Sequence, residues 1–99
     1  MDKIIKINNR NYRIKRTLRA VLDYEIENKK QTVDTLNDNI KMFYFILKNA
    51  NRKKTDEYDR FTLGYEAFLD ALDEDETILN ALTEGIEPEP EPEPEDKKK

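Results

Sequence analysis

Apolar and polar residues alternate along the first sixteen residues of the chain. Residues 3–7 and 12–16 are rich in β-branched side chains, and the polar run 8–11 between them contains three asparagines, which tolerate the left-handed backbone of tight turns. This pattern predicts a β-hairpin over residues 3–16. One face of the hairpin would carry Ile5, Ile7, Tyr12 and Ile14. Because an isolated hairpin is marginal in water, we expect this face to pack on helices.

The next two segments have apolar residues at helical spacing. The first helix is predicted at about 17–28, with Thr17 as its N-cap. Its inward face would carry Leu18, Val21, Leu22 and Ile26. The second is predicted at about 32–49, with Thr32 as its N-cap, and its inward face would carry Val33, Leu36, Ile40, Phe43, Tyr44 and Leu47. Since its carboxyl-terminal half is apolar on nearly every side, it is expected at the centre of the fold.

Two further helices are predicted at about 56–72 and 76–83. The inward face of the third helix would carry Phe61, Tyr65, Phe68, Leu69 and Leu72. The fourth would present Ile78, Leu79 and Leu82, and Gly85 is placed as its C-cap. The sequence therefore predicts an α+β fold that is mostly α, with an N-terminal hairpin packed on three or four helices in a single small domain, residues 1–86.

All four prolines of the chain lie in the Glu-Pro repeat that begins at Glu87. Proline has no backbone N–H, and it disfavours the helical conformation of the residue before it. The repeat therefore predicts a disordered, extended acidic arm over residues 87–99, about 35–40 Å long at roughly 3.1 Å per residue.

The chain contains no histidine and no cysteine, which removes the commonest general base, metal ligands and thiolate nucleophile. We therefore predict no enzymatic activity, no cofactor and no metal. The longest apolar run, residues 42–47, is too short to span a bilayer. A soluble intracellular protein without a membrane partner is the expectation.

Charge is distributed unevenly along the chain. Residues 1–19 hold seven basic residues and one acidic residue, whereas residues 56–99 hold four basic and sixteen acidic residues. The basic end offers a contact surface of Lys6, Arg13, Lys15, Arg16 and Arg19. One alternative function follows, a small nucleic-acid-binding or regulatory adaptor that uses the basic hairpin and is autoinhibited by the acidic tail. A solvated surface of uneven charge is the other interpretation.

Three apolar side chains project from the second predicted helix outside its main stripe: Met42, Phe45 and Ile46. Burying these three side chains requires a second packing surface in addition to the one that covers the main stripe. Either the third helix packs over them, or they form a patch that binds a partner.

The order of these parts resembles the small tail assembly chaperones of long-tailed, siphovirus-like bacteriophages, specifically the short product made before a programmed frameshift. In that family a strand pair leads into a helix with an Ala-x-x-x-(Asp/Glu)-x-Glu-like stretch, here Ala20 to Glu27. The resemblance covers roughly residues 3–86. Family members often have a glycine in the hairpin turn and another just after the first helix, where this chain has residues 8–11 and Lys29-Lys30.

The resemblance implies a non-enzymatic role in the cytoplasm of a bacterial host. Such chaperones coat the tape-measure protein, recruit subunits of the tail tube, associate with one another and are absent from the mature virion. A reversible coat needs a spare apolar face, for which Met42, Phe45 and Ile46 are the candidates. The family also implies a longer frameshifted product, and the terminal lysines 97–99 could be encoded by a slippery A-rich run.

Overall fold

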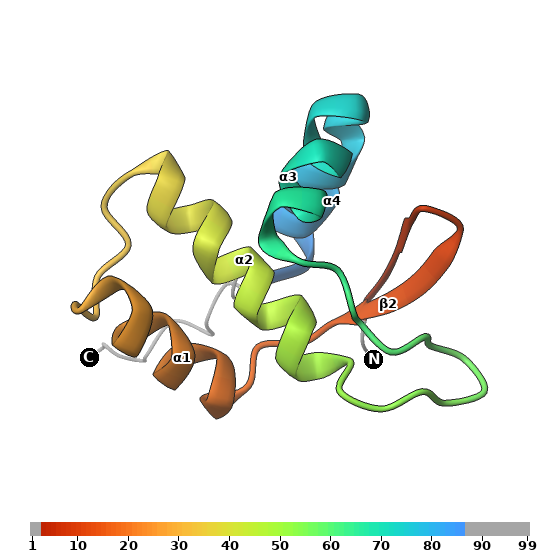
Figure 1. The fold of residues 1–99 in the computed structure, drawn as a ribbon, viewed down its shortest axis with the longest axis horizontal. Coiled ribbons are helices and arrows are strands. Elements are labelled where there is room, and N and C mark those ends of the chain that lie inside the picture. Colours follow the sequence, from red (N-terminus) through yellow and green to blue (C-terminus); the bar gives the residue numbers. More distant parts are fainter. Residues whose placement is uncertain (1–2, 87–99) are drawn as a thin grey trace, which may run out of the picture.

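The computed structural model describes residues 3–86, and the predicted arm at residues 87–99 lies outside the described residues. Within residues 3–86 a two-stranded antiparallel hairpin is followed by four helices (Figure 1), so the predicted α+β, mostly α fold is confirmed. The elements are β1 (Lys3–Ile7), β2 (Arg10–Ile14), α1 (Leu18–Asn28), α2 (Leu36–Ala50), α3 (Tyr65–Glu74) and α4 (Glu76–Ile86).

The hairpin is closed by a two-residue turn. Asn8 and Asn9 have φ values of 53° and 67°, and positive φ at both central residues matches the twist of the flanking strands. The strands pair with Ile5 opposite Tyr12. The predicted inner face is confirmed, because its four apolar residues are all buried: Ile5, Ile7, Tyr12 and Ile14.

Threonine side chains fix the beginnings of the first two helices. Thr17 caps α1, as predicted, by accepting a hydrogen bond from the backbone N–H of Ala20 at 3.2 Å. The prediction of Thr32 as the cap of α2 is wrong. Thr35 takes that position in a capping box with Asp38, in which each side chain accepts from the other residue's backbone N–H. The preceding segment, which contains Val33, is therefore outside the helix and exposed.

Helices α3 and α4 also differ from the prediction at their ends. Helix α3 begins only after Gly64, so Phe61 lies in the loop before it and is nevertheless buried. A single non-helical residue, Asp75, separates α3 from α4. Gly85 lies within α4 and does not cap it.

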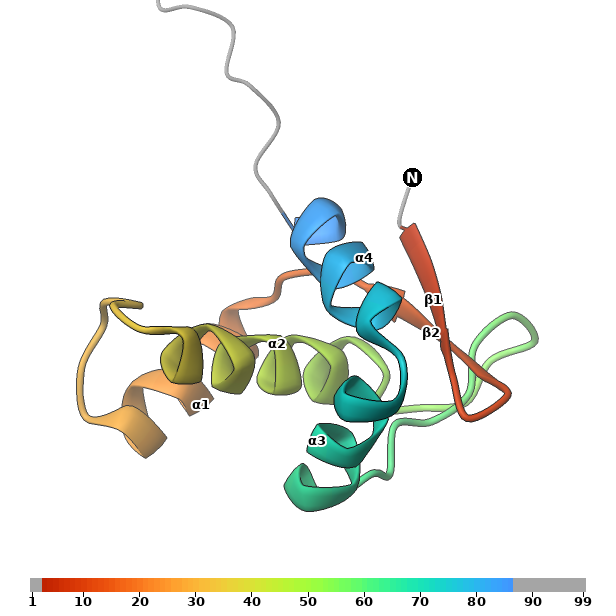
Figure 2. The ribbon, with the colours of Figure 1, turned by 90° about the horizontal axis from the view of Figure 1, so that it is seen from above.

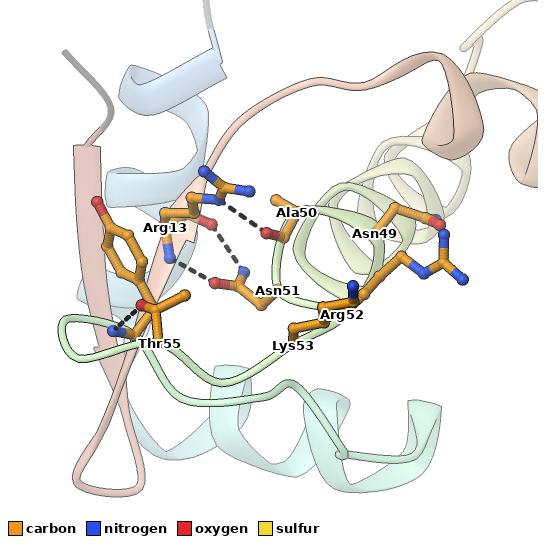
Figure 3. A pocket seen from close by; sticks show the side chains of 8 residues that line it. Arg13, Asn49, Ala50, Asn51, Arg52, Lys53 and Thr55 are labelled. Carbon is orange, nitrogen blue, oxygen red and sulfur yellow. Dashed lines mark hydrogen bonds between the residues drawn. The ribbon is translucent and has the colours of Figure 1, made fainter.

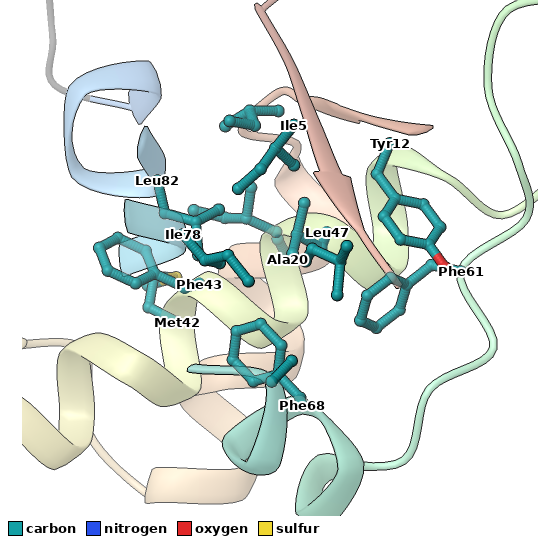
Figure 4. Packing of buried hydrophobic residues seen from close by; sticks show 14 of the residues in the cluster. Ile5, Tyr12, Ala20, Met42, Phe43, Leu47, Phe61, Phe68, Ile78 and Leu82 are labelled. Carbon is teal, nitrogen blue, oxygen red and sulfur yellow. The ribbon is translucent and has the colours of Figure 1, made fainter. Parts of the chain in front are cut away.

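Helix α2 runs through the middle of the described domain. Helix α1 lies alongside it, and the hairpin, α3 and α4 gather around its other sides (Figures 1 and 2). Figure 4 shows Phe43 and Leu47 of α2 among side chains from the other elements, including Tyr12, Phe68 and Leu82. The core therefore joins all six elements into one domain.

Candidate functional site

Helix α1 turns its most apolar side toward solvent. The side chains that face the core are Ala20 and Tyr24. Leu18, Leu22 and Ile26 follow one another at four-residue spacing and are 72%, 46% and 74% exposed. The prediction that these three residues pack inward is therefore wrong, and they form an exposed line that we call the α1 apolar stripe.

Three contacts explain why α1 adopts this orientation. The hydroxyl of Tyr24 donates a hydrogen bond to the backbone carbonyl of Thr32 at 2.6 Å, so the large ring can be buried with its polar atom satisfied. On the edge of α1 that borders α2, Asp23 accepts from Asn49 and Glu27 pairs with Lys41, at 3.0 and 3.1 Å. Because Tyr24 and this polar edge lie on the buried sides of α1, the leucines and the isoleucine are left on the exposed side.

The predicted partner-binding trio is mostly in the core. Met42 and Ile46 are buried, so they offer no surface to a partner in this structure, and that prediction is corrected for both. Phe45 is only partly buried. It lines a shallow hollow of about 380 Å³ over the outer side of α2, whose other lining residues are Glu27, Lys41, Tyr44, Lys48 and Tyr65.

The Lys41 ammonium in this hollow lies 4.7 Å from the ring centroid of Tyr65. The hydroxyl oxygen of Tyr65 is buried without a hydrogen-bond partner, and burial raises the pKa of this phenol. Tyr44, by contrast, donates its hydroxyl to the backbone carbonyl of Leu63 at 2.9 Å. The aromatic walls of this hollow are therefore Tyr44, which is fixed by its hydrogen bond to Leu63, and Tyr65, which lies next to Lys41.

A second feature is a basic hollow of about 460 Å³ at the carboxyl end of α2 (Figure 3). It is lined by Arg13, Asn49, Ala50, Asn51, Arg52, Lys53, Thr55 and Tyr58. A smaller neighbouring hollow shares Asn49 and Arg52 and adds Lys48, Arg60 and Phe61. No Asp or Glu lines either hollow. We call Arg13, Lys48, Arg52, Lys53 and Arg60 together the basic surface.

Asn51 joins the two sides of this hollow. Its side-chain amide pairs with the backbone of β2 as a neighbouring strand would. Its Oδ1 accepts from the backbone N–H of Arg13, and its Nδ2 donates to the carbonyl of Arg13, both at 2.9 Å. The same Nδ2 also donates to the carbonyl of Leu47. The Arg13 guanidinium donates to the carbonyl of Ala50 at 2.8 Å and lies over the ring of Tyr58. A cation at the carboxyl end of a helix is favourable there.

The loop after α2 is fastened to the hairpin next to the basic surface. Asp59 accepts the backbone N–H of Asn11 at 3.0 Å and pairs with Lys54 at 3.3 Å. The hydrogen bond from Asn11, followed by the contacts with Lys54, lowers the pKa of Asp59. This carboxylate is therefore engaged with Asn11 and Lys54 and does not line the hollow.

The predicted basic contact surface is divided by the fold. Arg13 is half-buried in the basic hollow, whereas Lys6, Lys15, Arg16 and Arg19 are exposed and line neither basic hollow. The other members of the basic surface come from the end of α2 and the loop after it. The sequence between the second and third predicted helices is polar and basic, but no local pattern places it next to Arg13.

Within residues 3–86, no group of three or more Asp and Glu side chains is arranged to hold a metal ion. No helix among these residues is long and apolar enough to cross a membrane. No protein-family model, curated protein or solved structure matches the chain.

Proposed function

We propose that this protein is a non-enzymatic tail assembly chaperone of a long-tailed bacteriophage, and that the α1 apolar stripe is the surface with which it binds an apolar helix of the tape-measure protein. The observation that carries the proposal is the exposure of Leu18, Leu22 and Ile26 in a line on a folded domain. Apolar side chains at i, i+4 and i+8 form one ridge along a helix, and ridges of this kind pack into the grooves of a second helix. In this proposal the stripe replaces Met42 and Ile46 as the contact surface.

The backbone of the hairpin turn and of the end of α1 is compatible with the resemblance on which the proposal is based. The family that the sequence resembles often has glycine in the hairpin turn and after the first helix. In this chain those places are occupied by Asn8, Asn9 and Lys29, and all three have positive φ. Because glycine is the residue that adopts positive φ at least cost, the chain keeps the backbone that the family's glycines favour.

The size of the stripe suits a reversible coat. Burying an exposed leucine or isoleucine completely is worth about 1.5–3 kcal/mol. Scaled by the exposed fractions of the three residues, the stripe offers about 3–6 kcal/mol. The entropy lost on association costs a comparable or larger amount. One copy would therefore bind weakly, and a row of copies on one long helix would bind firmly through multivalency.

The chaperone would act in the cytoplasm of the bacterial host and leave the tape-measure protein as tube subunits polymerise around it. Self-association of neighbouring copies would complete the coat. A longer frameshifted product would carry the same domain.

Co-expression with an apolar helical fragment of the proposed partner, the tape-measure protein, tests the proposal. The wild-type protein is expected to raise the soluble fraction of the fragment. Ile26→Ser, in the stripe, should lose most of this effect. Ile4→Ser is the matched control, since Ile4 is 53% exposed but lies on the hairpin. Equal solubility with and without the wild-type protein would reject the function, and equal effects of the two variants would reject the stripe as its surface.

The basic surface favours a second candidate function, nucleic-acid binding by a small adaptor. Binding of this kind depends on counterion release and therefore weakens steeply as salt rises. A gel shift with a single-stranded oligonucleotide at low and moderate salt tests it. Arg52→Glu/Lys53→Glu should abolish the shift, and no shift by the wild-type protein at low salt would rule this function out.

A further inference from the structure

The basic surface and the carboxyl-terminal segment of the chain are complementary in charge. Residues 87–99 contain six acidic residues, five of them in the Glu-Pro repeat, and three terminal lysines. The two hollows of the basic surface are lined by five cations and by no carboxylate. We propose that the basic surface is the docking site of the Glu-Pro segment of the same chain. This inference is independent of the proposed tail-assembly function.

Four cations of the basic surface differ from most other lysines of α1, α2 and their loops, because they have no acidic partner within residues 3–86: Lys48, Arg52, Lys53 and Arg60. Lys30, Lys41 and Lys54 each pair with a carboxylate, at 2.6, 3.1 and 3.3 Å. Four exposed cations around two adjoining hollows form a local positive field that attracts a chain of carboxylates.

The shape and chemistry of the larger hollow suit a proline-containing peptide. Tyr58 forms one wall, and its ring is held by the guanidinium of Arg13 at 5.7 Å from the ring centroid. Proline-rich segments in the extended polyproline conformation dock in aromatic-lined grooves, and Tyr58 is the aromatic residue that this hollow offers. Alternating glutamates would at the same time place carboxylates along the peptide near Arg52 and Lys53. Because proline limits the conformations of the free segment, less entropy is lost when the segment docks.

The segment is long enough to reach the site within one chain. Helix α4, which precedes it, packs against both strands of the hairpin, and Arg13 of the basic hollow belongs to β2. Thirteen extended residues at roughly 3.1 Å each span about 40 Å. The principal dimensions of the described domain are 48, 32 and 25 Å, so this span exceeds the two shorter ones. A contact in cis is therefore within reach, and it would keep other polyanions away from the basic surface.

Paramagnetic relaxation enhancement on the full chain tests this contact. Since the chain has no cysteine, Lys97→Cys provides one thiol for a nitroxide label and leaves every glutamate in place. At low salt, the label is expected to broaden the amide signals of Asn51, Arg52, Lys53 and Tyr58. Replacing the five glutamates of the repeat by glutamine, or adding high salt, should remove the broadening.

Two controls decide where and how the segment binds. Arg52→Glu/Lys53→Glu should abolish the broadening, whereas Lys15→Glu/Arg16→Glu makes the same charge change in another exposed basic pair and should preserve it. A mixture of isotope-labelled protein without nitroxide and unlabelled protein with nitroxide should show no broadening.

Three results would overturn the proposal. The first is broadening in the mixture, which means docking between copies. The second is broadening lost only in Lys15→Glu/Arg16→Glu, which moves the site to the hairpin end. The third is no broadening at low salt while an oligonucleotide binds at Arg52 and Lys53, which assigns the basic surface to nucleic acid.

Discussion

Replacement of Asn51 by alanine tests how the carboxyl end of α2 is fastened to the hairpin. The Asn51 side chain is almost completely buried, with 1% of its surface exposed. Alanine would remove both hydrogen bonds to the backbone of Arg13 and one to the carbonyl of Leu47. The Leu47 carbonyl would keep a partner, because it also accepts the backbone N–H of Asn51 at 3.1 Å. The two backbone groups of Arg13 would lose theirs.

The expected cost follows from these three bonds. A typical hydrogen bond contributes about 1 kcal/mol net, and a backbone group left without a partner costs about 1–3 kcal/mol. Since Arg13 is half-buried, water can compensate part of this loss. We therefore expect Asn51→Ala to lower the free energy of unfolding by about 2–4 kcal/mol, which is a large share of the stability of a small domain.

Urea unfolding followed by far-ultraviolet circular dichroism measures this difference. Asn49→Ala is the matched control, because Asn49 is less buried and bonds to Asp23 and to the carbonyl of Phe45. It should cost about 1 kcal/mol or less. Asn51→Asp keeps the acceptor for Arg13 but places an oxygen against two carbonyls, so it should be no more stable than Asn51→Ala. Equal losses for Asn51→Ala and Asn49→Ala would show that the Asn51 side chain does not fasten α2 to β2.

Two further predictions concern stability. Lys29 ends α1 with φ 60° and ψ 32°, so Lys29→Gly should raise the free energy of unfolding by about 0.5–1 kcal/mol, whereas Lys48→Gly inside α2 should lower it by about 1 kcal/mol; a loss in both would contradict the left-handed cap. Hydrogen bonding to Lys30, then to the Asp34 amide, lowers the pKa of Asp38 from 3.8 to about 2. Its contribution is therefore present above pH 4 and lost as pH falls toward 2. The stability difference between wild type and Asp38→Asn, measured by urea unfolding across this range, should shrink with falling pH, and a constant difference would exclude this role.

The hairpin and the position of α2 could be predicted because they follow local patterns. Ile5 and Ile7 alternate with polar residues at the period of a strand, and burial on one face is then the stable arrangement. The two asparagines of the turn adopt the conformation for which asparagine is suited. For α2, a helix that is apolar on several sides has to lie inside the fold.

The orientation of α1 could not be predicted in the same way. The helix has one apolar side with Leu18, Leu22 and Ile26 and another with Ala20 and Tyr24. The spacing of the larger aliphatic residues favoured the first side, although the second faces the core. The orientation is decided by contacts between segments distant in sequence, which bury the small side chain of Ala20 and the ring of Tyr24 in the core. The strongest apolar pattern of α1 therefore marks a free surface.

The basic surface could not be predicted from local sequence patterns either. Arg13 and Asn51 are joined by two hydrogen bonds across 38 positions of the chain. Arg52 and Lys53 could be recognised as part of a basic connector, but only the fold places this connector against β2. The capping box of Thr35 and Asp38, by contrast, is a local signal, because the two residues are three positions apart in the sequence. The prediction of Thr32 as the N-cap does not use this signal.

The proposal that the α1 apolar stripe binds an apolar helix is tested most directly by mapping the bound surface. A synthetic peptide with the sequence of an apolar helix of the proposed partner, the tape-measure protein, would be titrated into isotope-labelled full-length protein while the amide signals are recorded. If the stripe is the binding surface, the largest changes in amide chemical shift fall on residues 18–26, and the signals of Arg52 and Lys53 stay in place. Shifts centred on the basic surface, or no shifts at saturating peptide, would contradict it.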